Sequence, residues 1–117
     1  MRAPRALLAG PLLMAAAALF AACGGSSTPA TPSDPVLAEG QTIYNQKCAS
    51  CHGPGGNGGM GPKLAGVVAN RYPNIEDQKA VIANGRSSMP KFGGATGLSD
   101  EQITAVARYE REVLGSK

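Results

Sequence analysis

The sequence is poor in the residues from which most enzyme sites and most protein cores are built. It has one histidine, His52, and no tryptophan, and three tyrosines and two phenylalanines are its only aromatic residues. We find no paired carboxylates and no nucleophile–base set, so the chain offers no basis for a catalytic site or a small-molecule substrate. A short chain of this composition makes a thin apolar core and needs another source of stability.

An excess of charge is also missing. The whole chain has a net charge of +3, but two of its arginines, Arg2 and Arg5, lie at the extreme N-terminus. From Cys23 onward there are nine basic and eight acidic residues, which leaves a net charge of about +1. A balance this close to zero gives no reason to expect nucleic acid as a partner.

The only long apolar run follows those two arginines and spans residues 6–22, with Gly10 and Pro11 inside it. A basic start followed by such a run is typical of a secretory signal. Two small residues then precede Cys23, which resembles the lipobox of bacterial lipoproteins, although Phe20 stands where leucine is usual. Cleavage before a lipidated Cys23, a retained membrane helix and plain cleavage with release remain three alternatives, of which we favour the first.

This interpretation divides the chain into three parts. Residues 1–22 are predicted to be a signal peptide and residues 36–117 a single folded domain. Between them, residues 23–35 are rich in Gly, Ser, Thr and Pro, and a segment of this composition makes a flexible tether. We therefore expect an exported protein on the periplasmic or extracytoplasmic face, held at the membrane by lipidated Cys23.

The most informative motif is Cys48-Ala49-Ser50-Cys51-His52, which has the C-x-x-C-H pattern of c-type haem attachment. Each thiol can add across a haem vinyl group, and the adjacent imidazole can ligate the iron. A structural zinc site needs four Cys or His ligands and would have to recruit Cys23. A thioredoxin-like redox pair needs a βαβ context, which the glycine-rich loop after the motif does not offer. We predict one covalent haem c.

A second iron ligand has to come from another residue type because there is no second histidine. Methionine, water, lysine or a vacant site are the alternatives, and Met60 and Met89 are the methionines of the folded part. Met89 is far enough from His52 along the chain to reach the opposite haem face, and Pro90 stiffens its backbone. Met60 lies only eight residues from His52. We therefore predict Met89 as the axial ligand, and thioether sulfur raises the haem potential.

The periodicity of the folded part indicates helices and no strands. Residues 35–48 and 99–115 show the 3–4 spacing of apolar side chains, and a shorter helix is predicted over residues 75–84. Gly40 allows close approach of another helix, and we expect Tyr44 and Tyr109 to meet where the first and last helices cross. The predicted fold class is all-α, with three to five short helices and long loops.

Taken together, these residues resemble the class I c-type cytochromes of the small bacterial kind. The resemblance covers residues 40–114 and rests on an ordered set of segments: Gly40 with Tyr44, C-A-S-C-H, Gly61-Pro62-Lys63-Leu64, Ile82-Ala83-Asn84-Gly85, Met89-Pro90 with Phe92, and Leu98-Ser99-Asp100-Glu101 leading to Tyr109. The high-spin four-helix-bundle cytochromes differ, because their C-x-x-C-H lies near the C-terminus.

The resemblance implies a set of roles around the haem. Cys48 and Cys51 form the thioether bonds, and His52 and Met89 are the axial ligands of the iron. The carbonyl of Pro62 accepts a hydrogen bond from His52, which would fix the imidazole tautomer, and Leu64 is expected to contact the haem. Arg71 and Tyr72 are candidates to bind the propionates.

The expected function is one-electron transfer. The predicted partners are redox proteins: a quinol-oxidising complex or a dehydrogenase as donor, and a terminal oxidase or another carrier as acceptor. Lys63, Arg86 and Lys91 are candidates to surround the exposed haem edge, or are ordinary solvated charges. Two alternatives are a haem subunit serving as the electron outlet of a dehydrogenase, and a ligand-binding haem protein with a weak Met89 bond.

Overall fold

The computed structural model describes residues 29–117, which contain five helices and no strand. The helices are α1 (Pro35–Lys47), α2 (Ala49–His52), α3 (Val68–Arg71), α4 (Ile75–Asn84) and α5 (Asp100–Glu112). One isolated bridge joins Arg86 to Met89. The all-α prediction is confirmed for this part of the chain. The predicted signal peptide and the lipidation residue Cys23 lie outside it.

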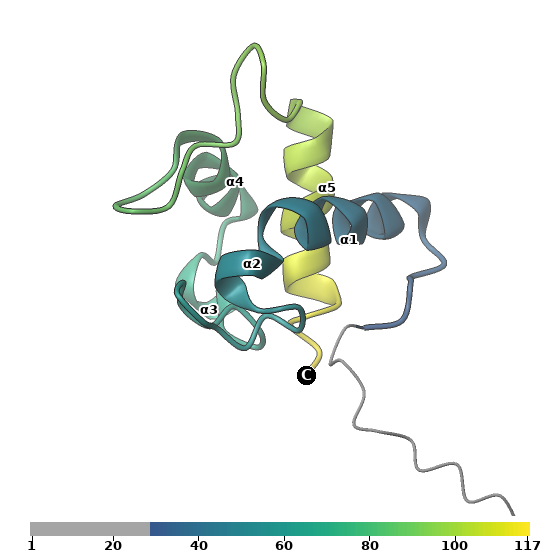
Figure 1. Cartoon of the computed structure of the whole chain (residues 1–117). Helices are drawn as coiled ribbons and strands as arrows, with labels where there is room; N and C mark the ends of the chain where they lie inside the picture. The colour runs from purple at the N-terminus through teal and green to yellow at the C-terminus, as the bar shows by residue number, and fades with distance from the viewer. Residues whose placement is uncertain (1–28) are drawn as a thin grey trace, which may run out of the picture.

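The first and last helices cross and form the centre of the fold (Figure 1). At the crossing, a Cβ atom added to Gly40 would overlap the carbonyl oxygen of Ala105 and lie 2.8 Å from the Cβ of Tyr109. The rings of Tyr44 and Tyr109 are 5.5 Å apart between centroids and tilted by 48°. Both tyrosines are fully buried, so the predicted pairing of these rings is confirmed.

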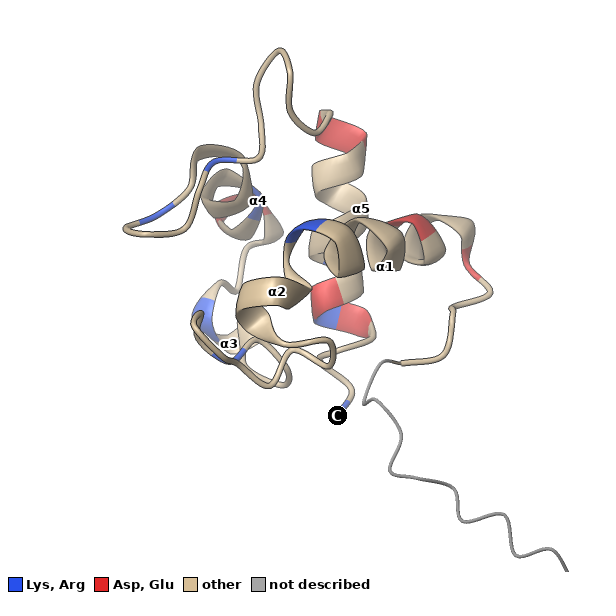
Figure 2. Cartoon of the chain, viewed as in Figure 1, with Lys and Arg blue, Asp and Glu red and all other residues tan. Residues whose placement is uncertain are grey.

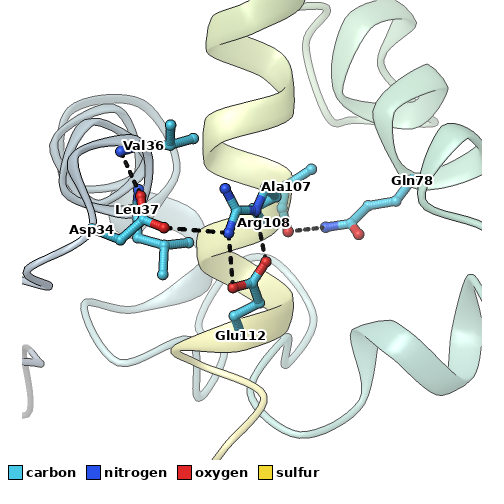
Figure 3. A network of polar contacts seen from close by, with 7 residues as sticks. All are labelled: Asp34, Val36, Leu37, Gln78, Ala107, Arg108 and Glu112. Atoms are coloured by element: carbon cyan, nitrogen blue, oxygen red, sulfur yellow. Dashed lines mark hydrogen bonds and ion pairs between the residues drawn. The ribbon is translucent and has the colours of Figure 1, made fainter.

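Polar contacts hold the start of α1 against α5. Asp34 caps α1, because its side chain accepts hydrogen bonds from the backbone N–H groups of Val36 and Leu37. The same carboxylate lies 3.5 Å from the guanidinium of Arg108, which also pairs with Glu112 one turn further along α5 (Figure 3). These groups are partly exposed, so we assign them a role in orientation and little net stability.

The last helix begins as predicted and ends earlier. Ser99 and Gln102 form both hydrogen bonds of a capping box. The prediction that the helix continues to Gly115 is wrong, since α5 ends at Glu112. The physical reason is Leu114, which is fully buried and whose N–H bonds back to the carbonyl of Tyr109, so the chain turns inward before the glycine.

The remaining elements flank the α1–α5 pair. Helix α4 has the predicted bounds and ends at Gly85, whose φ of +74° suits glycine. The short helices α2 and α3 were not predicted. The segment before α1 is held by Gln41 of α1. The side chain of Gln41 donates hydrogen bonds to the carbonyls of Pro29 (2.7 Å) and Ala30 (3.3 Å), so this segment packs against α1. Within residues 29–117, no helix has the length and apolar character needed to cross a membrane.

Candidate functional site

The C-x-x-C-H motif forms the short helix α2 and borders a cavity of about 1070 Å³. Cys48 is buried and Cys51 partly exposed; both are free thiols and both line the cavity. Burial raises the pKa of the Cys48 thiol to about 12, with the negative charge of Glu110 as a smaller cause, so this thiol is protonated at neutral pH. Two free thiols on one wall are what attachment of a large group requires.

His52 is held in a single orientation in the same wall. Its Nδ1 lies 2.8 Å from the carbonyl oxygen of Pro62, as predicted. A carbonyl only accepts, so Nδ1 carries the proton and Nε2 keeps its lone pair for a metal. Gly61 packs against the ring, since a Cβ atom there would lie 2.8 Å from Cε1 and 2.9 Å from Nδ1. Glycine at this position therefore leaves the space that the ring occupies.

Met89 reaches the cavity from a turn that follows α4. Two backbone hydrogen bonds between Arg86 and Met89, of 3.2 and 2.9 Å, close the turn. Ser87 sits within it at a φ of +55°, which is uncommon for a residue other than glycine. Beyond Met89, the N–H of Phe92 bonds to the carbonyl of Ile82 in α4 (3.1 Å). The turn is thus joined to α4 through Gly85 before the methionine and through the Phe92 hydrogen bond after it.

The rest of the cavity wall is mostly apolar. It includes Leu64, Val67, Val68, Ile82 and Phe92. Met60, the alternative ligand, is 88% exposed at the edge of this cavity, whereas Met89 packs against the core. The cavity volume lies slightly above the usual range for small-molecule sites, and the lining holds two thiols, an oriented imidazole and a thioether. This combination fits a haem.

Residues 29–117 offer no comparable site to a bare metal ion. Among the described residues, no group of three or more His, Cys, Asp or Glu side chains is arranged to hold one. The zinc alternative would need Cys23, which lies outside those residues. The donors that do come together are those suited to haem iron, a nitrogen and a soft sulfur.

Basic side chains gather at the cavity. Lys47, Lys63, Arg71 and Arg86 line it, and Arg86 donates a hydrogen bond to the Tyr72 hydroxyl at 3.0 Å. Lys91, the third residue predicted to surround the haem edge, is exposed and does not line the cavity. Several acidic residues lie instead around α1 and at the start of α5 (Figure 2). The propionate roles of Arg71 and Tyr72 stay predictions, although both residues line the cavity.

One acidic residue of the wall was missed by sequence reasoning. Glu110 in α5 is buried and lines the cavity together with Gln78 of α4. A sequence signal was present, because position 110 is seven residues after Ile103 and four after Val106, on the apolar face of the helix. A charged residue at such a position is almost never fully buried without a reason.

Comparison with known proteins identifies the family. The sequence model of the family described as cytochrome c oxidase, cbb3-type, subunit III matches residues 35–109. The chain belongs to this family. A cytochrome c6 from Leptolyngbya boryana is 40% identical over 75 residues, which cover 62% of the chain and 86% of that protein. Cytochrome c-551 from Bacillus subtilis is 37% identical over 99 residues, which cover 75% of the chain and 78% of that protein.

A solved structure agrees with these relatives. The cytochrome c6 of the diatom Phaeodactylum tricornutum superposes with a TM-score of 0.55 at 31% identity, covering 68% of the chain and 97% of that protein. The chain is therefore a small class I c-type cytochrome with one covalently attached haem, and its role is electron transfer. These relatives are electron carriers and generally not enzymes.

Proposed function

We propose that this cytochrome is a one-electron carrier whose iron is ligated by His52 and Met89, and that it works between membrane redox proteins outside the cytoplasm. The observation that supports it best is the cavity wall, where an imidazole with a fixed tautomer and a methionine on a closed turn line the same space. When bound, the haem supplies iron that cycles between the ferrous and ferric states. Because His52 and Met89 are each held in place by the protein, the ligand geometry should change little when an electron is transferred.

The haem-loaded protein tests this directly. We expect a six-coordinate low-spin visible spectrum in both oxidation states, and a reduced spectrum that carbon monoxide does not change. Both results follow if two protein ligands occupy the axial positions. The measurement is absorbance with and without carbon monoxide. Ready binding of carbon monoxide by the unaltered protein would instead favour the ligand-binding alternative and would contradict the proposed ligand set.

The proposed location rests on the N-terminal segment. A lipidated Cys23 followed by the tether of residues 23–35 would keep the domain near membrane partners at high local concentration. We expect Cys23→Ser to move the haem protein from the membrane fraction to the soluble fraction, or to leave it with an uncleaved signal. Immunoblots of separated fractions measure this, and Ser26→Ala serves as the matched control. Unchanged, correctly processed Cys23→Ser protein in the membrane would contradict the anchor.

A second candidate is a haem subunit that passes electrons within an enzyme complex. The observation that favours it is the description of the matching family, which names a subunit of an oxidase. Gentle detergent extraction from the native membrane separates the two candidates, since a free carrier migrates alone and a subunit co-migrates with larger polypeptides. A dehydrogenase and an oxidase as the larger partner are distinguished by identifying those polypeptides.

A further inference from the structure

Glu110 places a carboxyl group in the wall of the haem cavity. Its side chain is 5% exposed, and its Oε2 accepts a hydrogen bond of 2.7 Å from Nε2 of Gln78, which is itself 3% exposed. Gln78 also donates to the carbonyl of Ala107 at 3.4 Å (Figure 3). A carboxyl group in this position is expensive to ionise, because burial removes the water that would stabilise its charge.

Arg111, the next residue along α5, does not neutralise this carboxyl group. Arg111 directs its guanidinium to the backbone carbonyls of Tyr72 (2.7 Å) and Pro73 (3.1 Å) and to Oε1 of Gln78 (3.2 Å). These bonds fix the Gln78 amide so that its NH₂ group points to Glu110. Within residues 29–117, Glu110 takes part in no ion pair. Among the described residues, the Glu110 carboxylate is therefore stabilised by one neutral hydrogen-bond donor, the Gln78 amide.

In the described part of the chain, no other titratable group pairs with Glu110. Tyr44 of α1 and Cys48, the residue after α1, face it, and burial raises the pKa of both, so both are neutral at pH 7. Cys48 is consumed when the haem is attached. The remaining titratable groups of the cavity wall are Lys47, Cys51, His52, Lys63, Arg71, Tyr72 and Arg86. None of these forms a hydrogen bond or ion pair with Glu110 in the described part of the chain.

We propose that Glu110 is a redox-linked proton site. Its carboxylate takes one proton from solvent, forming an O–H bond, when the haem gains one electron from its donor protein. The O–H bond breaks and the proton returns to solvent when that electron passes to the acceptor. Each electron is thereby accompanied by partial proton uptake in a pH range around neutrality, about half a proton at most for a tenfold change in proton affinity, which is an activity beyond simple electron transfer.

The physical basis is the charge of the haem. Ferric haem carries one more positive charge than ferrous haem, and a nearby carboxylate in a medium of low dielectric stabilises the ferric form. Reduction removes that charge, so the carboxylate binds a proton more tightly. Burial, offset in part by the Gln78 hydrogen bond, raises the pKa of Glu110 to about 7 before any effect of the haem. The group therefore titrates in the range where an exported protein works.

The test is the reduction potential of the haem-loaded protein as a function of pH. We expect reduction to tighten proton binding by Glu110 about tenfold, the size at which two sites titrate as a coupled pair. For one electron this equals a fall in potential of about 59 mV as the pH rises from about 5 to about 9. Glu110→Gln should hold the high potential of acidic pH throughout. Glu112→Gln, an exposed glutamate two residues further along α5, is the matched control and should behave as the unaltered protein.

The propionates of the haem also titrate, and the experiment separates them from Glu110. A fall in potential that persists in full in Glu110→Gln belongs to the propionates and overturns the proposal. If that variant does not retain haem, infrared difference spectra of the unaltered protein replace it. Glutamate labelled with ¹³C in its side-chain carboxyl shifts the acid band that appears on reduction if Glu110 takes up the proton. A reduction-induced band that is absent, or that the label does not shift, overturns the proposal.

Discussion

Replacing Met89 by alanine should change the haem from six-coordinate low-spin to a form that binds carbon monoxide when reduced. The thioether is the proposed sixth ligand, and it approaches from a turn closed by two backbone hydrogen bonds. Its removal leaves that axial position open. The reduction potential should fall on the order of 0.1 V, within the range of about 0.8 V over which axial ligands tune haem. Visible spectroscopy with carbon monoxide and a redox titration measure the two effects.

The sequence supplies a matched control for this experiment. Met60 has the same side chain, lies at the edge of the same cavity and is 88% exposed. Met60→Ala should leave the spectrum, the response to carbon monoxide and the potential unchanged. The opposite pattern, with Met89→Ala silent and Met60→Ala opening the site, would assign the ligand to the glycine-rich loop after the attachment motif and contradict the proposed ligand set.

The second large effect is expected at the crossing of α1 and α5. Gly40→Val would place side-chain carbon where the carbonyl of Ala105 and the Cβ of Tyr109 already lie. Overpacking of this kind costs about 1–3 kcal/mol, and backbone on one side leaves little room to relax, so we expect at least about 3 kcal/mol. For a domain of this size that lowers the melting temperature by more than about 12 °C.

Thermal unfolding of the haem-loaded protein, followed by circular dichroism, checks this value. The control is Asn45→Val, which introduces the same β-branched residue at an exposed position of the same helix. That control has the small loss of helix propensity that valine causes, but not the steric overlap with α5. It should therefore unfold within a few degrees of the unaltered protein. Equal melting temperatures for the two variants would show that the helices separate to accept the side chain at little cost.

The sequence predicts those parts of the fold where local chemistry and tertiary packing agree. Helix α4 and the start of α5 have strong caps, Asn74 and Ser99, and the glycine at position 40 indicates the crossing before any coordinates are known. The hydrogen bond from His52 to Pro62 follows from the need of a ligating imidazole for an acceptor. The two caps have causes within a few residues of the sequence, whereas the crossing and the histidine hydrogen bond were indicated by the residue types that they require.

The features that escaped prediction have causes distant in the sequence. Helices α2 and α3 have four residues each, too short for any periodicity to register. The early end of α5 depends on the burial of Leu114 against other elements. Glu110 was overlooked because a charged residue is expected to face solvent, and only the packing of α4 against α5 shows that it faces the cavity.

The crossing of α1 with α5 also determines the order of events when the protein is made. Helix α1 ends at Lys47 and α5 begins at Asp100, so the centre of the fold cannot assemble until nearly all of the chain has been synthesised. Cys48 is only 5% exposed once it has assembled. The Cys48 thiol is therefore more accessible to haem before α5 packs against α1, and the packing of α5 ends that interval. The late packing of α5 therefore leaves an interval in which the haem can be attached to the cysteines.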